Sequence, residues 1–273
     1  MLTKESTYEL NNKVEIPILG LGTWRLSGEE AVQAVLWAIE EGYRLIDTAA
    51  LYGNEKKIGE AIAQSPIPRE ELFITTKVWD SDHGYKKTLK AFDRSLKKLD
   101  LEFVDLYLIH WPATSKRDET WKALEKIYEE GRAKAIGVSN YTIRHLKELL
   151  EVSEVVPAVN QVEFSPFLYQ QDLLEFCRSK DIYLEAYSPL TKGKKLSNPA
   201  LIQMAEKYNK SPAQIMLRWA IQHKVIVIPK SGSKQHLKEN IDLFDFEIAT
   251  DDMNTLDDLD KNYRTVTDPA TYD

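Results

Sequence analysis

Residues 73–77 read FITTK, a run of strand-forming residues that ends on the ionisable side chain of Lys77. Similar runs lie on either side: residues 43–47 end on Asp47 just before Tyr52, and residues 104–110 end on His110. A helical pattern of apolar residues follows each run, so the three belong to consecutive β-α units. In a (β/α)₈ barrel the carboxyl ends of the strands meet on one face. These four ionisable side chains would then converge on one pocket.

The same alternation continues along the chain and predicts eight strands. They are expected at residues 19–24, 43–47, 72–77, 104–110, 133–138, 158–162, 182–187 and 225–228. Strands that each lead into a helix form a parallel sheet with right-handed crossovers, and eight such units close into a barrel.

Segments outside the repeat complete the expected fold. Residues 8–18 alternate around Asn11-Asn12 and predict a β-hairpin, while residues 251–259 predict an extra outer helix. No linker rich in Gly, Ser or Pro divides the chain. The fold class is therefore predicted as α/β, a (β/α)₈ TIM barrel with an N-terminal β-hairpin and extra C-terminal helices, in one domain over residues 1–273.

Two helix starts carry recognisable signals. Ser27 and Glu30 have the spacing of a capping box ahead of the first helix. Ser211-Pro212 predicts an N-cap followed by proline at the first helical position.

Composition narrows the class of protein. The 273 residues are 43% hydrophobic and 29% charged, which is ordinary globular composition. A net charge of -7 argues against nucleic-acid and anionic-membrane partners. No stretch approaches the roughly 18 apolar residues of a membrane span, and the amino terminus lacks the apolar run of a signal peptide. We expect a soluble cytoplasmic protein, a monomer, with its single Cys177 inert on a buried helix face.

The four strand-end residues suggest acid-base chemistry. Taken singly, each has a plain structural explanation: an Asp can cap a helix, a Lys can extend to solvent, and a His can be structural. Together they suit proton donation to a carbonyl. A Lys77 ammonium about 4 Å from Tyr52 would supply roughly 4 kcal/mol, enough to lower the phenol pKa from near 10 toward 7. Asp47 would keep Lys77 charged, and His110 would orient the substrate oxygen.

At these positions the sequence closely resembles the aldo-keto reductase family. The motifs that match, in order, are residues 47–55 (DTAALYGNE), 75–77 (TTK), 107–112 (YLIHWP), 137–140 (GVSN), 160–161 (NQ) and 228–231 (IPKS). The resemblance implies a barrel that reduces small carbonyl substrates with a nicotinamide cofactor, Tyr52 donating the proton as hydride reaches the carbonyl carbon. The loops after the fourth and seventh predicted strands and the C-terminal tail are short. In this respect the chain resembles the compact microbial branch of the family, which includes diketogluconate and methylglyoxal reductases. The alternative is a non-catalytic, cofactor-binding regulatory subunit on the same fold. The presence of all four candidate catalytic residues favours the enzyme over this alternative.

The cofactor is not expected to bind through a Rossmann fingerprint. In Gly20-Leu21-Gly22 the third glycine position is occupied by Arg25. The family resemblance instead implies that Ser139, Asn140 and Gln161 hold the carboxamide and that Tyr187 stacks on the nicotinamide ring. The alternative reading is that Ser139-Asn140 only caps the next helix. The expected cofactor contacts are Thr23, Trp24, Asp47, Ser139, Asn140, Gln161, Tyr187, Ser188, Leu190, Lys230, Ser231, Gly232, Ser233, His236, Glu239 and Asn240.

A phosphate site is expected directly after strand 8. Residues 230–233 (KSGS) open a helix there, and Lys230 adds a full charge, which favours NADPH. The family usually has an arginine where this chain has His236, and losing a guanidinium weakens bidentate phosphate recognition. The protein is therefore expected to prefer NADPH, and use of NADH as a second cofactor remains an alternative. Glu239 and Asn240 match the positions that would meet the adenine amine.

The mouth of the predicted pocket is expected to bind the substrate. Trp24, Trp79 and Trp111 each lie just past a strand end and, with His110, would receive apolar or sugar-like substrates.

No metal is expected, because the other histidines (His83, His145, His223 and His236) sit in helical or loop positions.

Overall fold

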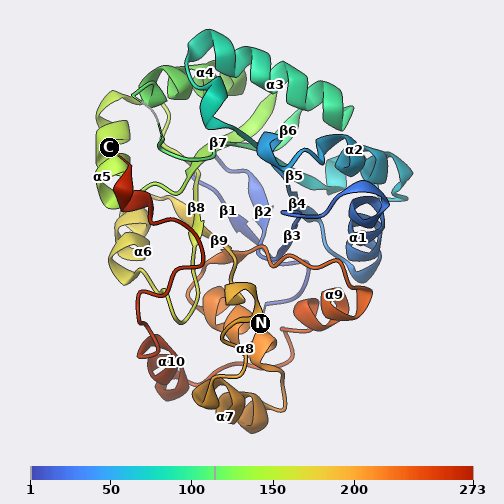
Figure 1. Ribbon diagram of the computed structural model, residues 1–273, viewed down its shortest axis with the longest axis vertical. Coiled ribbons are helices and arrows are strands. Elements are labelled where there is room, and N and C mark those ends of the chain that lie inside the picture. Colours follow the sequence, from blue (N-terminus) through green and yellow to red (C-terminus); the bar gives the residue numbers. More distant parts are fainter. Residues whose placement is uncertain (1, 114, 273) are drawn as a thin grey trace.

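The computed structural model describes residues 2–113 and 115–272. Met1 and Asp273, the two ends of the predicted domain, lie outside them. Within this range a nearly closed barrel of eight parallel strands is surrounded by helices (Figure 1). The barrel strands, in spatial order, are β3 (Gly20–Gly22), β4 (Leu45–Asp47), β5 (Phe73–Val78), β6 (Val104–Ile109), β7 (Ala133–Ser139), β8 (Val159–Glu163), β9 (Tyr183–Tyr187) and β10 (Ile226–Val227). The predicted fold class is confirmed.

The barrel closes where β3 meets β10. Parallel bridges join Leu19 to Val227 and Gly22 to Lys230. A Cβ at Gly22 would lie 2.7 Å from the carbonyl oxygen of Ile228, closer than a side chain tolerates. This glycine therefore allows the two edge strands to approach, a role consistent with the expectation that Gly20-Leu21-Gly22 is no dinucleotide fingerprint.

The helices lie outside the sheet and bury their apolar faces on it. The helices that connect or follow the barrel strands include α1 (Gly28–Glu41), α2 (Glu55–Gln64), α3 (Tyr85–Leu99), α4 (Arg117–Glu129), α5 (Ile143–Val152), α6 (Gln171–Arg178), α8 (Pro212–Gln222) and α9 (Lys234–Ile241). Cys177 is fully buried on α6, as expected. None of the helices among the described residues has the length and apolar character needed to cross a bilayer.

The two predicted helix caps have different outcomes. Ser211 caps α8 in a capping box, with proline at the start of the helix, which confirms that prediction. The capping box of Ser27 and Glu30 is wrong, because the Ser27 side chain makes no capping hydrogen bond. Gly28, the first residue of α1, has a φ of 54°. The chain therefore enters α1 through a residue in the left-handed conformation, which departs from the regular start of a capped helix.

The predicted N-terminal hairpin closes one end of the barrel. It consists of β1 (Thr7–Glu9) and β2 (Glu15–Pro17), paired antiparallel. Its buried Leu10 and Ile16 join a cluster inside the barrel with residues such as Leu106 and Val159. Because this end is filled by side chains, only the opposite end, where the strands finish, is open for a site.

The C-terminal third differs from the expected short connections. The predicted outer helix is present as α10 (Thr250–Asp257), but an additional helix, α7 (Pro199–Tyr208), lies between β9 and α8, so the connection after strand 7 is longer than expected. After α10 the chain runs back over the strand ends toward α5 (Figure 1). The ring centroid of Tyr272 in this tail lies 5.4 Å from that of Trp111, with the two rings tilted by 44°. The tail is therefore part of the rim of the site.

Candidate active site

Asp47, Lys77 and Tyr52 meet at the open end of the barrel. Asp47 ends β4, Lys77 lies on β5, and Tyr52 ends a short 3₁₀ turn after β4. Lys77 Nζ lies 2.6 and 2.7 Å from the two carboxylate oxygens of Asp47 and 3.4 Å from the Tyr52 hydroxyl. It also donates to the carbonyl oxygen of Thr48 at 2.9 Å. Both members of the ion pair are buried, so water does not compete for these contacts.

The electrostatics of this cluster differ from the sequence expectation in one respect. Burial is the largest single effect and lowers the pKa of Lys77, but the charge and hydrogen bond of Asp47, together with Tyr52 and Glu185, hold that pKa above its ordinary value. Burial also raises the pKa of Tyr52, and the opposing effect of Lys77 is the smaller one. The expected lowering of the Tyr52 pKa toward 7 is therefore wrong. Desolvation of the phenolate exceeds the single nearby positive charge, so the phenol stays protonated at neutral pH.

His110 lies directly after β6, beside Tyr52 and Trp79. Its ring centroid is 5.6 Å from that of Tyr52 and 5.2 Å from that of Trp79, both edge-on. Burial, followed by the charges of Lys77 and His83, holds the pKa of His110 well below its ordinary value. Its Nδ1 is buried and has no hydrogen-bond partner among the described residues. The low pKa keeps the imidazole neutral at neutral pH, and His110 lines the cavity described next.

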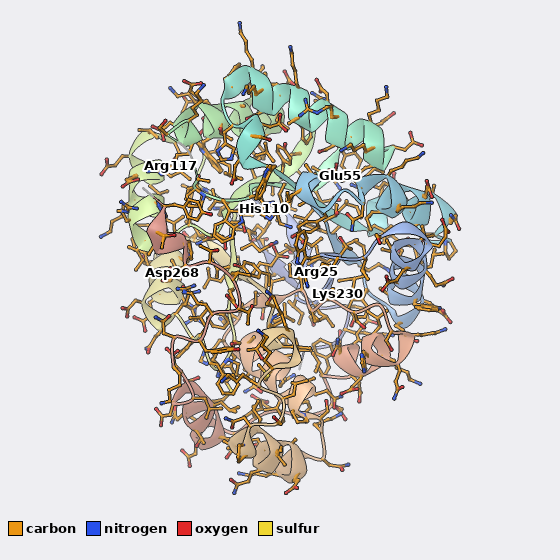
Figure 2. All side chains as sticks on the ribbon, viewed as in Figure 1. Arg25, Glu55, His110, Arg117, Lys230 and Asp268 are labelled. Atoms are coloured by element: carbon orange, nitrogen blue, oxygen red, sulfur yellow. The ribbon has the colours of Figure 1, made fainter. Side chains whose placement is uncertain are left out.

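A cavity of about 360 Å³ opens above these side chains. Figure 2 shows His110, Arg25 and Lys230 around it, over the open end of the barrel. The sequence-predicted residues that line it are Trp24, Asp47, Tyr52, His110, Trp111, Ser139, Asn140, Gln161, Tyr187, Ser188, Leu190 and Lys230. The structure thus brings most of the predicted site together around one space.

The other predicted residues lie away from the cavity wall. Lys77 is buried in an ion pair with Asp47, and Trp79 is in edge-on contact with His110. Thr23 is buried and donates its hydroxyl to the backbone oxygen of Asp47 at 2.8 Å. The residues near α9 that do not line the cavity are Ser231, Gly232, Ser233, His236, Glu239 and Asn240.

The amide-binding group expected from the sequence forms a hydrogen-bonded chain. Asn140 Nδ2 donates to the His110 carbonyl oxygen at 2.9 Å and to Ser139 Oγ at 3.1 Å, and Tyr187 donates its hydroxyl to Asn140 Oδ1 at 2.7 Å. The reading of Ser139-Asn140 as a helix cap is wrong, because Thr142 caps α5. These hydrogen bonds fix the orientation of the Asn140 amide in the cavity wall, and its Oδ1 keeps one lone pair.

The start of α9 retains the features of an anion site. Ser233 caps the helix, and the backbone N–H of Ser233 bonds Ser231 Oγ at 3.0 Å. Lys230 and His236 are exposed, whereas Asn240 is buried. A helix start with an exposed lysine beside it favours a negatively charged ligand.

Sequence reasoning missed several residues of the cavity. Arg25, Leu51 and Lys192 come from loops after strands, and Val266 comes from the tail. Arg25 and Lys192 both have left-handed backbone conformations, with φ of 64° and 53°. The cations could have been found by reading every loop that follows a barrel strand for charge. Val266 had no such signal, because its place depends on the path of the tail.

Among the described residues no cluster of three or more His, Cys, Asp or Glu side chains could hold a metal ion.

The comparisons with known proteins agree with this geometry. The Aldo/keto reductase family profile matches residues 18–261. The chain is 51% identical over 266 residues to a glyoxal reductase of Bacillus subtilis (strain 168), covering 97% of this chain and 96% of the relative. It is similar to the crystal structure of an aldo-keto reductase from a Medee basin deep-sea metagenome library, with a TM-score of 0.96, 45% identity, and 98% of this chain and 100% of that chain covered.

A third comparison involves a structure with a bound nucleotide. An aldo-keto reductase of Bombyx mori, solved in complex with NADP, superposes with a TM-score of 0.91 at 38% identity, covering 99% of this chain and 98% of that chain. The family match, the barrel and the relatives with reductase names lead to one assignment: the chain belongs to the aldo/keto reductase family, a family of oxidoreductases.

Proposed function

We propose that this protein reduces small aldehydes and ketones to alcohols with NADPH. The observation that carries the proposal is the Tyr52 hydroxyl, which lies 3.4 Å from a Lys77 ammonium fixed by Asp47 and borders the cavity. The Bacillus subtilis relative is named a glyoxal reductase, which makes glyoxal and related small aldehydes the first substrates to test.

The residues around the cavity fit a nicotinamide nucleotide. Tyr187 offers an aromatic face, Gln161 offers an amide, and Lys230 beside the start of α9 offers positive charge for phosphate. A bound reduced nicotinamide supplies the hydride for the carbonyl carbon. The protein must then bind and orient the carbonyl and deliver a proton to its oxygen.

Tyr52 is proposed as the proton donor. Because burial keeps its phenol protonated, the proton is available at neutral pH. As the proton leaves, negative charge develops on the phenol oxygen, and Lys77 stabilises that charge from 3.4 Å. Asp47 holds the lysine in place and charged. This arrangement favours the transition state over the resting phenol, which is the requirement for catalysis.

His110 is proposed to orient the substrate. A neutral imidazole can donate one N–H to the carbonyl oxygen without adding a charge that would compete with Tyr52. The T-shaped contacts of its ring with Tyr52 and Trp79 limit its rotation. Trp24 and Trp111 line the outer cavity and would cover the rest of the substrate.

The preference for NADPH over NADH is proposed to depend on Lys230. Its ammonium is exposed next to α9, where a 2′-phosphate would be recognised. His236 on the same helix is exposed and lacks the five-donor fork of an arginine. We therefore propose a preference for NADPH with measurable activity on NADH.

Replacement of the proposed donor tests the function. For wild type and Tyr52→Phe, turnover of a panel of small aldehydes is followed by loss of reduced-cofactor absorbance, with NADPH and NADH in parallel. We expect Tyr52→Phe to lose at least about two orders of magnitude in kcat, while NADPH still binds, because the ring remains. Equal turnover in the two proteins would refute the assignment of Tyr52.

A further inference from the structure

Glu185 is a buried carboxyl group that the mechanism above does not use. It lies on β9 inside the barrel and is fully buried. Its Oε2 accepts a hydrogen bond from Gln161 Nε2 at 2.9 Å, whereas its Oε1 has no partner among the described residues. A buried carboxyl group is costly unless it is hydrogen-bonded or paired with a charge. Its one bonded neighbour is a residue of the cavity wall.

The hydrogen bonds of Gln161 determine which end of its amide faces the cavity. Nε2 carries two hydrogens, and it donates to Asp47 Oδ2 at 2.8 Å as well as to Glu185 Oε2. The amide nitrogen therefore has no hydrogen left for a ligand. No described residue donates to Gln161 Oε1, and Gln161 lines the cavity. The acceptor end of the amide is the end that remains for a ligand.

Asp47 disfavours the reverse orientation. If the amide turned over, Oε1 would lie against the carboxylate of Asp47, and both donations from Nε2 would be lost. Asp47 alone would leave one N–H of Gln161 without an acceptor in the barrel, and that N–H could turn toward a ligand. Glu185 removes this freedom.

We propose that Glu185 is a positioning residue that locks Gln161 with its carbonyl oxygen toward the cavity, so that the site selects a cofactor ring whose substituent donates an N–H. This inference rests on the proposed function, since the ring in question is the nicotinamide. The chemical class selected is a primary carboxamide over a ketone in the same position.

The charge of Glu185 is not required for this role. Burial, together with the negative charge of Asp47, raises the pKa of Glu185 to about 8. At neutral pH the group is mostly protonated, and its carbonyl oxygen accepts from Gln161. A glutamine at position 185 keeps such an oxygen. Glu185→Gln is therefore the matched control for Glu185→Met, which keeps the length of the side chain and removes the acceptor.

The test compares NADPH with its reduced 3-acetylpyridine analogue, in which a methyl ketone replaces the carboxamide. Dissociation constants for both are measured by cofactor fluorescence with wild type, Glu185→Gln and Glu185→Met. Wild type and Glu185→Gln should bind the analogue at least about tenfold more weakly than NADPH, because the Gln161 oxygen loses its donor. In Glu185→Met this ratio should fall to within about threefold, because Gln161 can turn and donate to the ketone.

The outcomes separate three explanations. If Glu185→Met only loosens the site, both ligands bind more weakly by the same factor. The ratio of the dissociation constants of the analogue and NADPH then stays at its wild-type value, and this result overturns the inference. A wild type that binds NADPH and the analogue equally also overturns it. A wild type that binds neither ligand overturns the proposed function itself. If Glu185→Met does not fold, as judged by its thermal unfolding, Glu185→Ala carries the same comparison, with the same ratio deciding.

Discussion

Replacing Lys77 by methionine tests the physical core of the proposed mechanism. The substitution keeps most of the length and apolar stem of the side chain and removes the ammonium. Two sets of contacts disappear: the ion pair with Asp47 at 2.6 and 2.7 Å and the contact with the Tyr52 hydroxyl at 3.4 Å. The first bears on stability and the second on proton transfer, so the two effects can be measured apart.

The expected loss of turnover follows from the distance between Lys77 Nζ and the Tyr52 oxygen. At 3.4 Å, an effective dielectric constant of about 20 gives roughly 5 kcal/mol between the ammonium and a full phenolate charge. With between half and all of that charge developed in the transition state, kcat should fall by about 60-fold to about 4,000-fold. The affinity for NADPH should change little, because Lys77 does not line the cavity.

Stability requires its own control. In Lys77→Met the buried Asp47 loses its charged partner, and breaking a buried pair in this way typically costs about 3–5 kcal/mol. The double variant Asp47→Asn with Lys77→Met removes the unpaired charge, while residue 47 can still accept from Gln161. We expect the double variant to regain much of the lost free energy of unfolding, measured by urea denaturation. Its kcat should recover only the part that the unpaired Asp47 charge removes by raising the pKa of Tyr52, and should stay well below that of wild type.

The comparison has a clear refuting result. If Lys77→Met keeps kcat within about threefold of wild type while folded, the ammonium does not assist proton transfer. If the double variant regains turnover together with stability, the loss in the single variant came from misfolding, and the electrostatic reasoning is wrong.

Two further predictions concern pH and cofactor preference. Because buried His110 stays neutral in the folded protein while an unfolded histidine binds a proton below about pH 6.5, the unfolded state binds more protons there and acid destabilises the fold. Between about pH 6.5 and about pH 5, the free energy of unfolding of wild type should therefore fall more steeply than that of His110→Gln, and parallel slopes in urea denaturation would contradict this. Lys230→Ala should raise the KM for NADPH by about tenfold, as expected for a lost charged contact, and leave the KM for NADH unchanged. His236→Arg should shift preference the other way, and steady-state kinetics with equal effects on both cofactors would show that neither residue meets the 2′-phosphate.

The order of the strands and the four ionisable residues could be predicted because both depend on local pattern and on one general rule. Each barrel strand is a short apolar run next to a helical pattern, and these periodicities are visible without any long-range information. The ends of parallel strands then converge in any closed barrel, so Asp47, Tyr52 and His110 were expected near one another before their distances were known. The hairpin and the N-cap at Ser211 were predicted for the same local reason.

Other features depended on contacts between distant segments. The sequence gives no sign that burial of Tyr52 outweighs the charge of Lys77, because desolvation is set by everything packed around the phenol. The rim formed by Val266 and Tyr272 depends on the route of the tail across the barrel.

The sequence by itself determined the barrel, the family and the residue types available for acid-base chemistry, since these follow from periodicity and from position along each strand. Only the tertiary structure decided how those groups are protonated and oriented. Asp47, Gln161 and Glu185 lie on three different strands, and the hydrogen bonds that orient the Gln161 amide between two carboxyl groups exist only once the barrel has closed. The physical reason is that burial and hydrogen-bond geometry are properties of the packed neighbourhood, which no local pattern encodes.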